Sequence, residues 1–251
     1  MKENKIKTAL KFLVLLTVSL FTAFPFIWMI LSALKTKAEI MNVGAFFPAV
    51  PQWSNFVSVI FDSPLPGYIF NSLWVSLAVV ALQVITGAMI TYAMVFLDFK
   101  GKNALFALVM GTYMLPVAAT YIPSYIILSK CNLLDTMTGL ILSSSVSIFG
   151  IFLLRQSFMQ VPKGLVEAAR IDGGSHFRIL WEIICPMTKS SFITFGLMSF
   201  ISTYNNYMWP SLITKSQEKY LVSQGLRSFF IEGGAYGTEW ALVMAGSALI
   251  V

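Results

Sequence analysis

Residues 167–186 read EAARIDGGSHFRILWEIICP and separate two apolar stretches of this 251-residue chain. The segment gathers five charged side chains within sixteen positions: Glu167, Arg170, Asp172, Arg178 and Glu182. The runs on either side, Thr136–Leu154 and Ser190–Thr214, contain no Asp, Glu, Lys or Arg. A charged segment between two such runs predicts a water-facing loop of a membrane protein, placed where a soluble partner can reach it.

Uncharged runs of this kind extend over the whole chain. The sequence is 57% hydrophobic and 11% charged, whereas a soluble domain has about 25% charged residues. Each run reaches or approaches the roughly 20 residues that a helix needs to cross the hydrocarbon core, and helices satisfy their own backbone groups in lipid. We therefore predict an all-α, polytopic membrane helix bundle whose first five spans are Phe12–Leu34, Ser63–Leu97, Asn103–Ser129, Thr136–Leu154 and Ser190–Thr214.

A sixth apolar run starts at Trp240 and stops at Val251, where the sequence ends. Its twelve residues rise about 18 Å in a helix, which is too short to cross. Either the last helix is truncated or the run is re-entrant, and we favour truncation. We expect six transmembrane helices, the last one truncated, in a single transmembrane domain that covers residues 1–251.

The distribution of basic residues predicts the orientation in the membrane. With the N-terminus in the cytoplasm, eleven Lys and Arg residues fall inside and six fall outside, in agreement with the positive-inside rule. The net charge of +6 then reflects topology, and no basic stripe with interleaved aromatic residues indicates nucleic acid. We expect a multi-pass cell-membrane protein, surrounded by lipid, whose longest cytoplasmic loop is about 155–189. Cys131 and Cys185 fall on opposite sides, so no disulfide is expected.

The first half of the 155–189 loop has the pattern of a short helix. Pro162 suits a first helical position, because its missing N–H is no loss there. Gly173 and Gly174 suit the C-terminal end, where glycine accepts left-handed backbone angles. One face of this helix carries small residues that allow close approach of another surface: Leu165, Ala168, Ala169 and Asp172.

The second half of the loop predicts another helix. Ser175 can cap its first turn, and Pro186 is expected to end it. Its apolar stripe consists of Phe177, Leu180, Trp181 and Ile184. From periodicity alone, the helix–turn–helix is either an amphipathic connector lying on the lipid headgroups or a docking element for a partner.

Two further features of the sequence each allow two interpretations. Pro116 and Pro123 lie in one uncharged run, where each removes a backbone hydrogen bond; they form either a static kink or a hinge or gate. Asn205 and Asn206 are polar residues inside the fifth run. They act either as interhelical glue or as part of the lining of a substrate path.

The spacing Glu-Ala-Ala, three residues, Gly, nine residues, Ile-x-x-Pro resembles the EAA signature of bacterial ABC importer permeases. The matching residues are Glu167, Ala168, Ala169, Asp172, Gly173, Ile183 and Pro186. Gly174 replaces a common alanine and Cys185 a common leucine, and neither change removes a charge or the central glycine. The resemblance implies a type I ABC importer permease fold, and an ATPase-coupling loop that also includes Arg170 and Gly174.

Other stretches resemble the same family. MLPVAATYIP, from residue 114, is similar to the third span of carbohydrate-importer permeases. YNNYMWP, residues 204–210, resembles their W-N-x-[FY]-x-W-P segment with Tyr204 in place of tryptophan. The likeness is to MalG-like subunits. It implies a substrate pathway or permease–permease interface at Asn205, Asn206, Tyr207 and Trp209.

The resemblance also implies partners and a mechanism. The expected partners are a second homologous permease subunit, two cytosolic ABC ATPase subunits and an extracytoplasmic substrate-binding protein, which the 215–239 loop would reach. The expected activity is alternating-access import of a sugar, an oligosaccharide or a glycerol-phosphate-like solute. The alternative is an ion-gradient-driven secondary transporter, a class that tends to carry intramembrane charges and repeated halves, neither of which occurs here.

Several site types are not expected in this chain. It has no G-x-x-x-x-G-K-[ST] motif, so ATP would be bound by the partner ATPases and this chain would carry no cofactor. His176 is the only histidine and no Cys/His/Asp cluster has metal-ligand spacing. No catalytic constellation indicates an enzyme.

Overall fold

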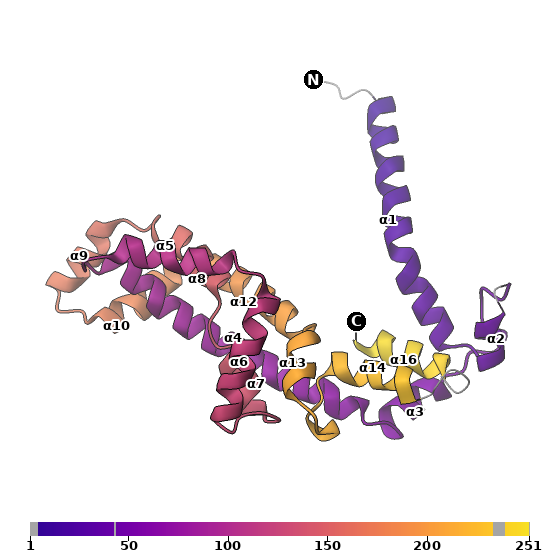
Figure 1. Cartoon of the computed structure of the whole chain (residues 1–251). Helices are drawn as coiled ribbons and strands as arrows, with labels where there is room; N and C mark the ends of the chain where they lie inside the picture. Colours follow the sequence, from indigo (N-terminus) through magenta and orange to yellow (C-terminus); the bar gives the residue numbers. More distant parts are fainter. Residues whose placement is uncertain (1–4, 43, 233–238, 251) are drawn as a thin grey trace. The chain divides into compact units, whose positions relative to one another are not determined.

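The computed structural model describes residues 5–42, 44–232 and 239–250, and within these ranges the regular structure is helical, without strands (Figure 1). The chain divides into two compact units. One consists of residues 1–69 with 225–251, and the other of residues 70–224. The all-α prediction is confirmed.

The first unit is built around α1 (Lys5–Ala33) and α16 (Trp240–Ile250), which contact each other. α16 also contacts the short helices α2 (Lys37–Met41) and α3 (Ser54–Phe61). Most side chains of α1 are exposed, although the helix is apolar enough to cross a membrane. Such a surface is what a lipid-facing or subunit-facing span presents.

The segment between α1 and α3 is held by polar contacts. Asn55 Nδ2 donates to the carbonyl oxygens of Ala33 and Lys35, at 2.8 and 3.1 Å. The Lys35 side chain is buried, donates to the carbonyl of Ala45 at 2.5 Å and lies 4.4 Å from the ring centroid of Trp28. Aromatic contact of this kind favours a desolvated ammonium.

The second unit contains most of α4 (Leu65–Phe96), a continuous helix of 32 residues. The other spans expected in this unit are broken. α5 (Lys102–Tyr113) and α6 (Val117–Lys130) meet at 102°, and α7 (Met137–Ser143) and α8 (Ile148–Phe158) meet at 44°. The fifth run contains α12 (Lys189–Tyr204) and α13 (Met208–Ile213), separated by residues 205–207.

The expected count of six spans is not confirmed. Among the described residues, only α1 and α4 are single helices long enough to cross. Up to five spans result if each of three bent pairs counts as one: α5 with α6, α7 with α8, and residues 176–187 with α12, which meet at 86°. α16 is a shorter apolar helix. The breaks fall at sites where the sequence offers the backbone other hydrogen-bond partners or removes a donor, as at Pro116.

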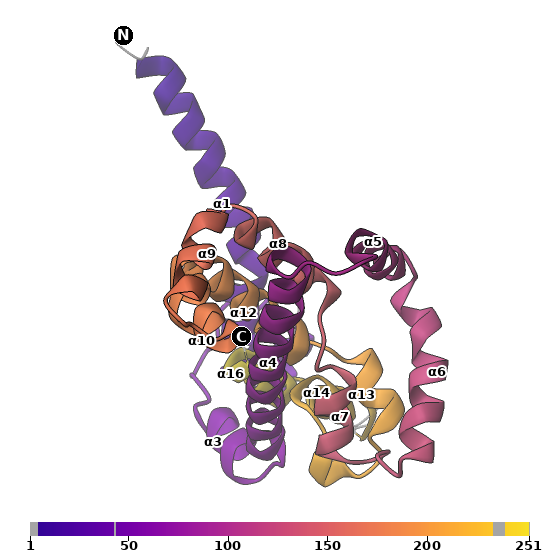
Figure 2. The ribbon, with the colours of Figure 1, turned by 90° about the vertical axis from the view of Figure 1, so that its left-hand side faces the viewer.

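The bend between α5 and α6 lies at one of the two prolines predicted to kink the third run. α5 ends at Tyr113, and Pro116 is the residue before the first residue of α6. Figure 2 shows the sharp corner between the two helices. Pro123 lies inside α6, which continues through it. Whether the corner moves as a gate stays a prediction.

The helices α4, α8 and α12 pack closely through small residues. A Cβ at Gly150 of α8 would overlap the ring of Phe195 of α12. A Cβ at Gly87 of α4 would lie 3.4 Å from Leu154 and 3.6 Å from Phe195. These glycines allow three helix backbones to approach around one buried aromatic ring. The buried cluster around this ring continues into the 155–189 loop.

The turn between α6 and α7 is clamped by Asp135, which has a positive φ of 53°. Its carboxylate accepts the backbone N–H groups of Lys215 and Ser216, at 2.9 and 3.0 Å, and the Ser216 hydroxyl at 2.5 Å. The Lys219 ammonium donates to its backbone carbonyl at 2.6 Å. The hydrogen bond from the Ser216 hydroxyl, followed by those from the Ser216 and Lys215 amides, holds the pKa of Asp135 well below its usual range.

The 215–239 segment is more helical than expected. Its described residues include a 3-10 turn, η2 (Gln217–Lys219), and a helix, α14 (Val222–Glu232). Val222 is buried and donates its N–H to the Ser72 hydroxyl of α4 at 2.7 Å. Residues 233–238, part of the loop predicted to reach a binding protein, lie outside the described residues.

Candidate functional site

The first helix of the 155–189 loop is α9 (Lys163–Ile171), and two glycines form the turn at its C-terminal end. Gly173 has a φ of +82° and donates its N–H to the Arg170 carbonyl at 3.0 Å. Gly174 donates to the Ala169 carbonyl at 2.9 Å. These two bonds form a Schellman motif, which satisfies the last carbonyls of the helix. The predicted helix end at the glycine pair is confirmed.

Both glycines are needed at this turn, for different reasons. A side chain at Gly173 would strain the left-handed backbone. At Gly174, a Cβ would lie 2.7 Å from the Ala169 carbonyl oxygen. Pro162 was expected at the first helical position and instead precedes it, because α9 begins at Lys163.

The second half of the loop starts with α10 (His176–Ile179), continues as the π-helix η1 (Leu180–Ile184) and ends with α11 (Cys185–Met187). The Ser175 hydroxyl accepts the Arg178 N–H at 3.3 Å, so the predicted cap is confirmed. Pro186 lies inside α11 and does not end the helix, which contradicts the prediction. At the first turn of a helical segment a missing N–H is tolerated.

The predicted apolar stripe of the second helix is partly wrong. Leu180 and Ile184 are buried, but Phe177 is 64% exposed, and Ile179 is buried in its place. Phe177 and Ile179 both lie in α10, before the π-helix, and it is Ile179 that enters the buried cluster with Val166 and Tyr92. This choice depends on contacts with distant residues, which sequence periodicity does not detect.

The inner face of the loop is anchored to the helix core. Val166 of α9 belongs to the same buried cluster as Ile179, Leu180 and Ile184, together with Ala88 and Tyr92 of α4 and Leu154 and Phe158 of α8. Both views show α9 and α10 beside the C-terminal end of α4 (Figures 1 and 2). The Tyr92 hydroxyl lies 3.0 Å from His176 Nδ1, so His176 takes part in this attachment.

The outer face of α9 is exposed and carries the predicted coupling residues. Ile171 is 86% exposed. The charged residues form no ion pair with other described residues. The exposed members of the predicted set on this helix and at its end are Glu167, Ala168, Arg170, Asp172 and Gly173.

A hollow of about 300 Å³ separates α9 from the second helix of the loop. Arg178 and Glu182 form an ion pair at 2.7 Å across one turn at its edge. Its lining includes Ala169, Asp172, Gly174 and Ile183 from the predicted coupling set. The structure thus brings most of the EAA-signature residues to one surface, with Pro186 exposed beyond it.

Cys185 follows η1 directly. It is half-buried and unpaired, and burial raises the pKa of its thiol to about 11. Cys131 is also unpaired and is exposed.

The structure places the YNNYMWP residues in two environments. Asn206 accepts the Trp209 N–H at 3.4 Å, in the break before α13, and Asn205 is exposed. Trp209 is buried, donates to the Ser143 hydroxyl at 2.9 Å and stacks on Tyr121. Tyr207 lies between them, partly buried. Their assignment to a pathway or a permease–permease interface stays a prediction.

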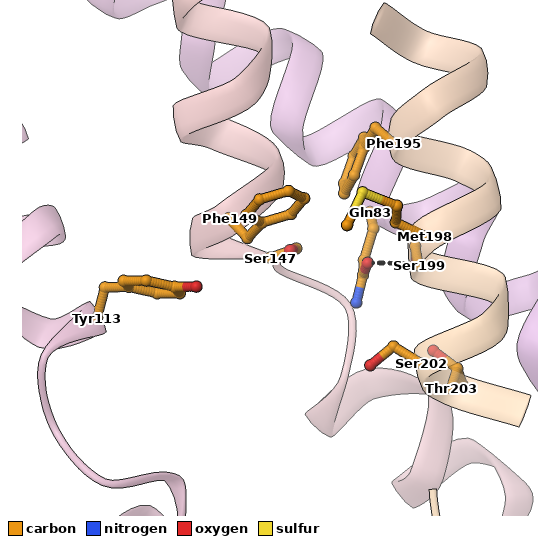
Figure 3. A pocket seen from close by; sticks show the side chains of 9 residues that line it. All are labelled: Gln83, Tyr113, Ser147, Phe149, Phe195, Met198, Ser199, Ser202 and Thr203. Atoms are coloured by element: carbon orange, nitrogen blue, oxygen red, sulfur yellow. Dashed lines mark hydrogen bonds between the residues drawn. The ribbon is translucent and has the colours of Figure 1, made fainter. Parts of the chain in front are cut away.

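A second hollow, of about 350 Å³, lies among helices of the second unit (Figure 3). Sequence reasoning missed it, because its residues come from four separate helices or their ends. Among the described residues, no group of three or more His, Cys, Asp or Glu has the placement of a metal site. The lining of the hollow is Gln83, Tyr113, Ser147, Phe149, Phe195, Met198, Ser199, Ser202 and Thr203.

Residues 83–251 match a protein family described as "Binding-protein-dependent transport system inner membrane component". The arabinooligosaccharides transport system permease protein AraQ of Bacillus subtilis strain 168 is 30% identical over 237 residues, covering 93% of this chain and 83% of AraQ. The sn-glycerol-3-phosphate transport system permease protein UgpE of Yersinia enterocolitica is 35% identical over 188 residues, covering 75% and 66% of the two chains.

Two solved structures share the fold. One is a bacterial ABC transporter involved in the import of the acidic polysaccharide alginate, with a TM-score of 0.85 and 20% identity, covering 100% of this chain and 92% of the solved one. The other is a bacterial alginate ABC transporter in complex with an alginate pentasaccharide-bound periplasmic protein, with a TM-score of 0.62 and 15% identity over 98% and 89% of the two chains.

Proposed function

The chain belongs to the family of binding-protein-dependent transport system inner membrane components, and from this membership we propose that its 155–189 loop is the element through which partner ATPases drive transport. The protein is a multi-pass membrane permease subunit of an ABC importer. The alternative of an ion-gradient-driven transporter finds no support in this family.

The observation that carries the proposal is the two-faced construction of the loop. Its inner face is buried against α4 and α8 through residues such as Val166 and Ile184. Its outer face presents Ile171 and uncompensated charges to solvent. A helix that is anchored on one side and offers an exposed apolar anchor on the other is suited to receive a partner surface and to transmit its movement.

The proposed assembly has four further members: a second permease, two ATPase subunits that bind ATP, and an extracytoplasmic binding protein. Support for the binding protein comes from the family description and from the similar alginate transporter in complex with its periplasmic protein. ATP-driven movement of the loop would switch the bundle between inward-facing and outward-facing states. The positive-inside bias supports a cytoplasmic N-terminus and 155–189 loop.

The proposed solute is a sugar, an oligosaccharide or a glycerol-phosphate-like molecule. The support is the naming of relatives as permeases for arabinooligosaccharides and for sn-glycerol 3-phosphate. Within the proposed assembly the chain forms half of the translocation pathway and performs no covalent chemistry of its own.

Replacing Ile171 with alanine tests the coupling proposal. Burying an isoleucine at an interface contributes about 1.5–3 kcal/mol, so we expect the ATPase to bind the Ile171→Ala permease at least about 10-fold more weakly. The matched control is Ile127→Ala on α6, a site that is also exposed but distant from the loop in sequence. Co-purification of the ATPase and solute-stimulated ATP hydrolysis are measured. Equal docking by both variants would show that α9 is only a connector.

A further inference from the structure

The 350 Å³ hollow in Figure 3 is formed within a single unit of the chain. Its walls come from α4, the last residue of α5, the start of α8 and the C-terminal half of α12. Gln83 lies near the middle of α4, a helix long and apolar enough to span a membrane. The hollow is therefore at intramembrane depth, and its volume is near the lower end of the range for small-molecule sites, about 300–1,000 Å³.

Its lining is polar but contains no charged residue. Five hydroxyl side chains and one amide line it, together with three aromatic rings, those of Tyr113, Phe149 and Phe195. In a low-dielectric site, a phosphate or carboxylate without a cationic partner loses its hydration without compensation. Neutral hydroxyl groups, in contrast, can exchange water for hydroxyl and amide partners, and the faces of a sugar ring can lie against aromatic side chains.

One donor in the hollow is fixed in place. Gln83 Oε1 accepts the Ser199 hydroxyl at 2.6 Å, and Gln83 Nε2 donates to the Ser144 carbonyl at 2.7 Å. Because a carbonyl can only accept, this second bond determines which end of the amide carries the nitrogen. The remaining N–H of Nε2 is then preorganised, and Figure 3 shows the nitrogen directed toward the side of the hollow where Ser202 lies.

Several other polar side chains of the lining make no hydrogen bond that stabilises the fold of the described residues. The side chains of Tyr113, Ser202 and Thr203 make no hydrogen bond with the rest of the described chain. The Tyr113 hydroxyl points into the hollow from the side opposite α12 (Figure 3). If the hollow served only to join helices, these groups would be expected to pair across it. Free hydroxyls facing a preorganised donor instead match a hydroxyl-rich ligand.

We propose that this hollow binds one uncharged sugar ring of the transported solute. The inference rests on the proposed transport function and narrows it to neutral saccharides, because the hollow offers no partner for an anion. Ser202, Tyr113 and Gln83 are the residues that would select for ring hydroxyls.

The test uses the complete transporter, with both permeases, ATPases and binding protein, in proteoliposomes. The probes are radiolabelled neutral saccharides, including arabinose and arabinotriose, each set against anionic probes, sn-glycerol 3-phosphate and a uronic acid trisaccharide. We expect ATP-dependent uptake of at least one neutral saccharide and not of the anionic probes. Uptake confined to an anionic probe, or ATP-dependent uptake of no neutral saccharide, would overturn the assignment.

Variants then locate the selecting groups. Losing one hydrogen bond to the ligand by Ser202→Ala or Tyr113→Phe is expected to raise the KM for the neutral saccharide about 3- to 10-fold, with ATPase docking unchanged. The control is Ser211→Ala on α13, whose hydroxyl bonds only to the Met208 carbonyl of its own helix. Unchanged KM in both hollow variants would reject the site.

The measurements distinguish failure of the sugar site from failure of the proposed ATP-driven transport. If an anionic probe is carried in an ATP-dependent manner, the transport function stands and the assignment of the hollow fails. If neutral uptake persists without ATP and collapses with an uncoupler, the ABC mechanism itself is wrong. ATPase co-purification with the wild-type chain separates an inactive reconstitution from a chain that does not dock.

Discussion

The hydroxyl of Tyr92 lies 3.0 Å from Nδ1 of His176, although the two residues are 84 positions apart. Their rings meet edge to face, with centroids 5.8 Å apart. Tyr92 is buried in α4, nine residues after Gln83, and His176 is the first residue of α10 in the 155–189 loop. The same rigid helix therefore connects the loop to the hollow.

Removing this hydrogen bond should weaken coupling without preventing docking. In Tyr92→Phe the ring still packs beside Phe96, but one net hydrogen bond of about 0.5–1.5 kcal/mol is lost. We expect about 2- to 10-fold fewer solute molecules transported per ATP hydrolysed, measured in proteoliposomes. Tyr125→Phe is the control, because the Tyr125 hydroxyl makes no hydrogen bond with the described chain. Identical stoichiometry in the two variants would contradict a role for the contact.

Substitution of Gly173 should disrupt the end of α9. A valine there must adopt a φ near +82°, at a cost of about 1 kcal/mol or more. We expect Gly173→Val to insert into the membrane but to lose ATPase docking or stimulation, as measured by co-purification and ATP hydrolysis. Gly164→Ala is the matched control, since a Cβ at that position meets nothing within 4 Å. Loss of docking in both variants would show that the effect does not depend on the left-handed backbone at Gly173.

Reversing the charge of Glu167 tests the electrostatic part of docking. Its side chain is exposed and makes no ion pair with the described chain. If a cationic group of the ATPase faces it, Glu167→Lys removes an attraction and adds a repulsion, and truncating a buried charge pair costs about 2–5 kcal/mol. We expect binding of the ATPase to fall at least about 30-fold, measured by titration with purified ATPase. Wild-type affinity in this variant would place Glu167 outside the interface.

The Asp135 clamp should remain intact in mild acid. The folded pKa of Asp135 is depressed, so the carboxylate stabilises the fold at pH values above its unfolded pKa of about 3.9. That contribution is lost only as the pH falls through the lower, folded value. Amide hydrogen exchange at Lys215 and Ser216, corrected for the intrinsic pH dependence, should keep the same protection between pH 7 and pH 5. Asp135→Ala should reduce it about 10-fold or more, whereas Asp62→Ala should not.

The two native cysteines should report the orientation of the chain. In intact cells, a membrane-impermeant maleimide is expected to label exposed Cys131 from outside. In detergent, Cys185 should react slowly at pH 7.5, because its pKa of about 11 leaves little thiolate, and its rate should rise about tenfold per pH unit up to that value. Mass spectrometry distinguishes the sites. Labelling of Lys163→Cys, but not of Lys219→Cys, from outside would reverse the proposed topology.

The sequence predicted the features that depend on local chemistry. Gly173 and Gly174 end α9 with a Schellman motif, and Ser175 caps α10, because both outcomes depend on residues within a few positions. Pro116 marks the corner between α5 and α6 for the same reason. The prediction of a membrane-spanning helix bundle followed from the lengths of the uncharged runs.

Features that depend on distant contacts were missed. Nothing near Asp135 in sequence indicates that its carboxylate binds residues 215 and 216, and nothing near Tyr92 indicates His176. Phe177 was wrongly assigned to the buried stripe because the core contacts of Ile179, with Val166 and Tyr92, are made with residues distant in sequence. One signal for the hollow was available: a glutamine in the middle of an uncharged run, Gln83, is costly in lipid and indicates a polar environment.

The insertion of the Phe195 ring into the space above Gly150 has a mechanical consequence. A ring that fills the place of a missing side chain prevents α8 and α12 from sliding past each other, so these two walls of the hollow must be displaced as one body. The wall formed by α5 is differently attached: Phe106 lies 4.0 Å from the Arg155 guanidinium, whereas Tyr113, two turns further on, adjoins the 102° corner. We therefore predict that the hollow opens by movement of Tyr113 about the corner between α5 and α6, while the wall formed by α8 and α12 keeps its geometry.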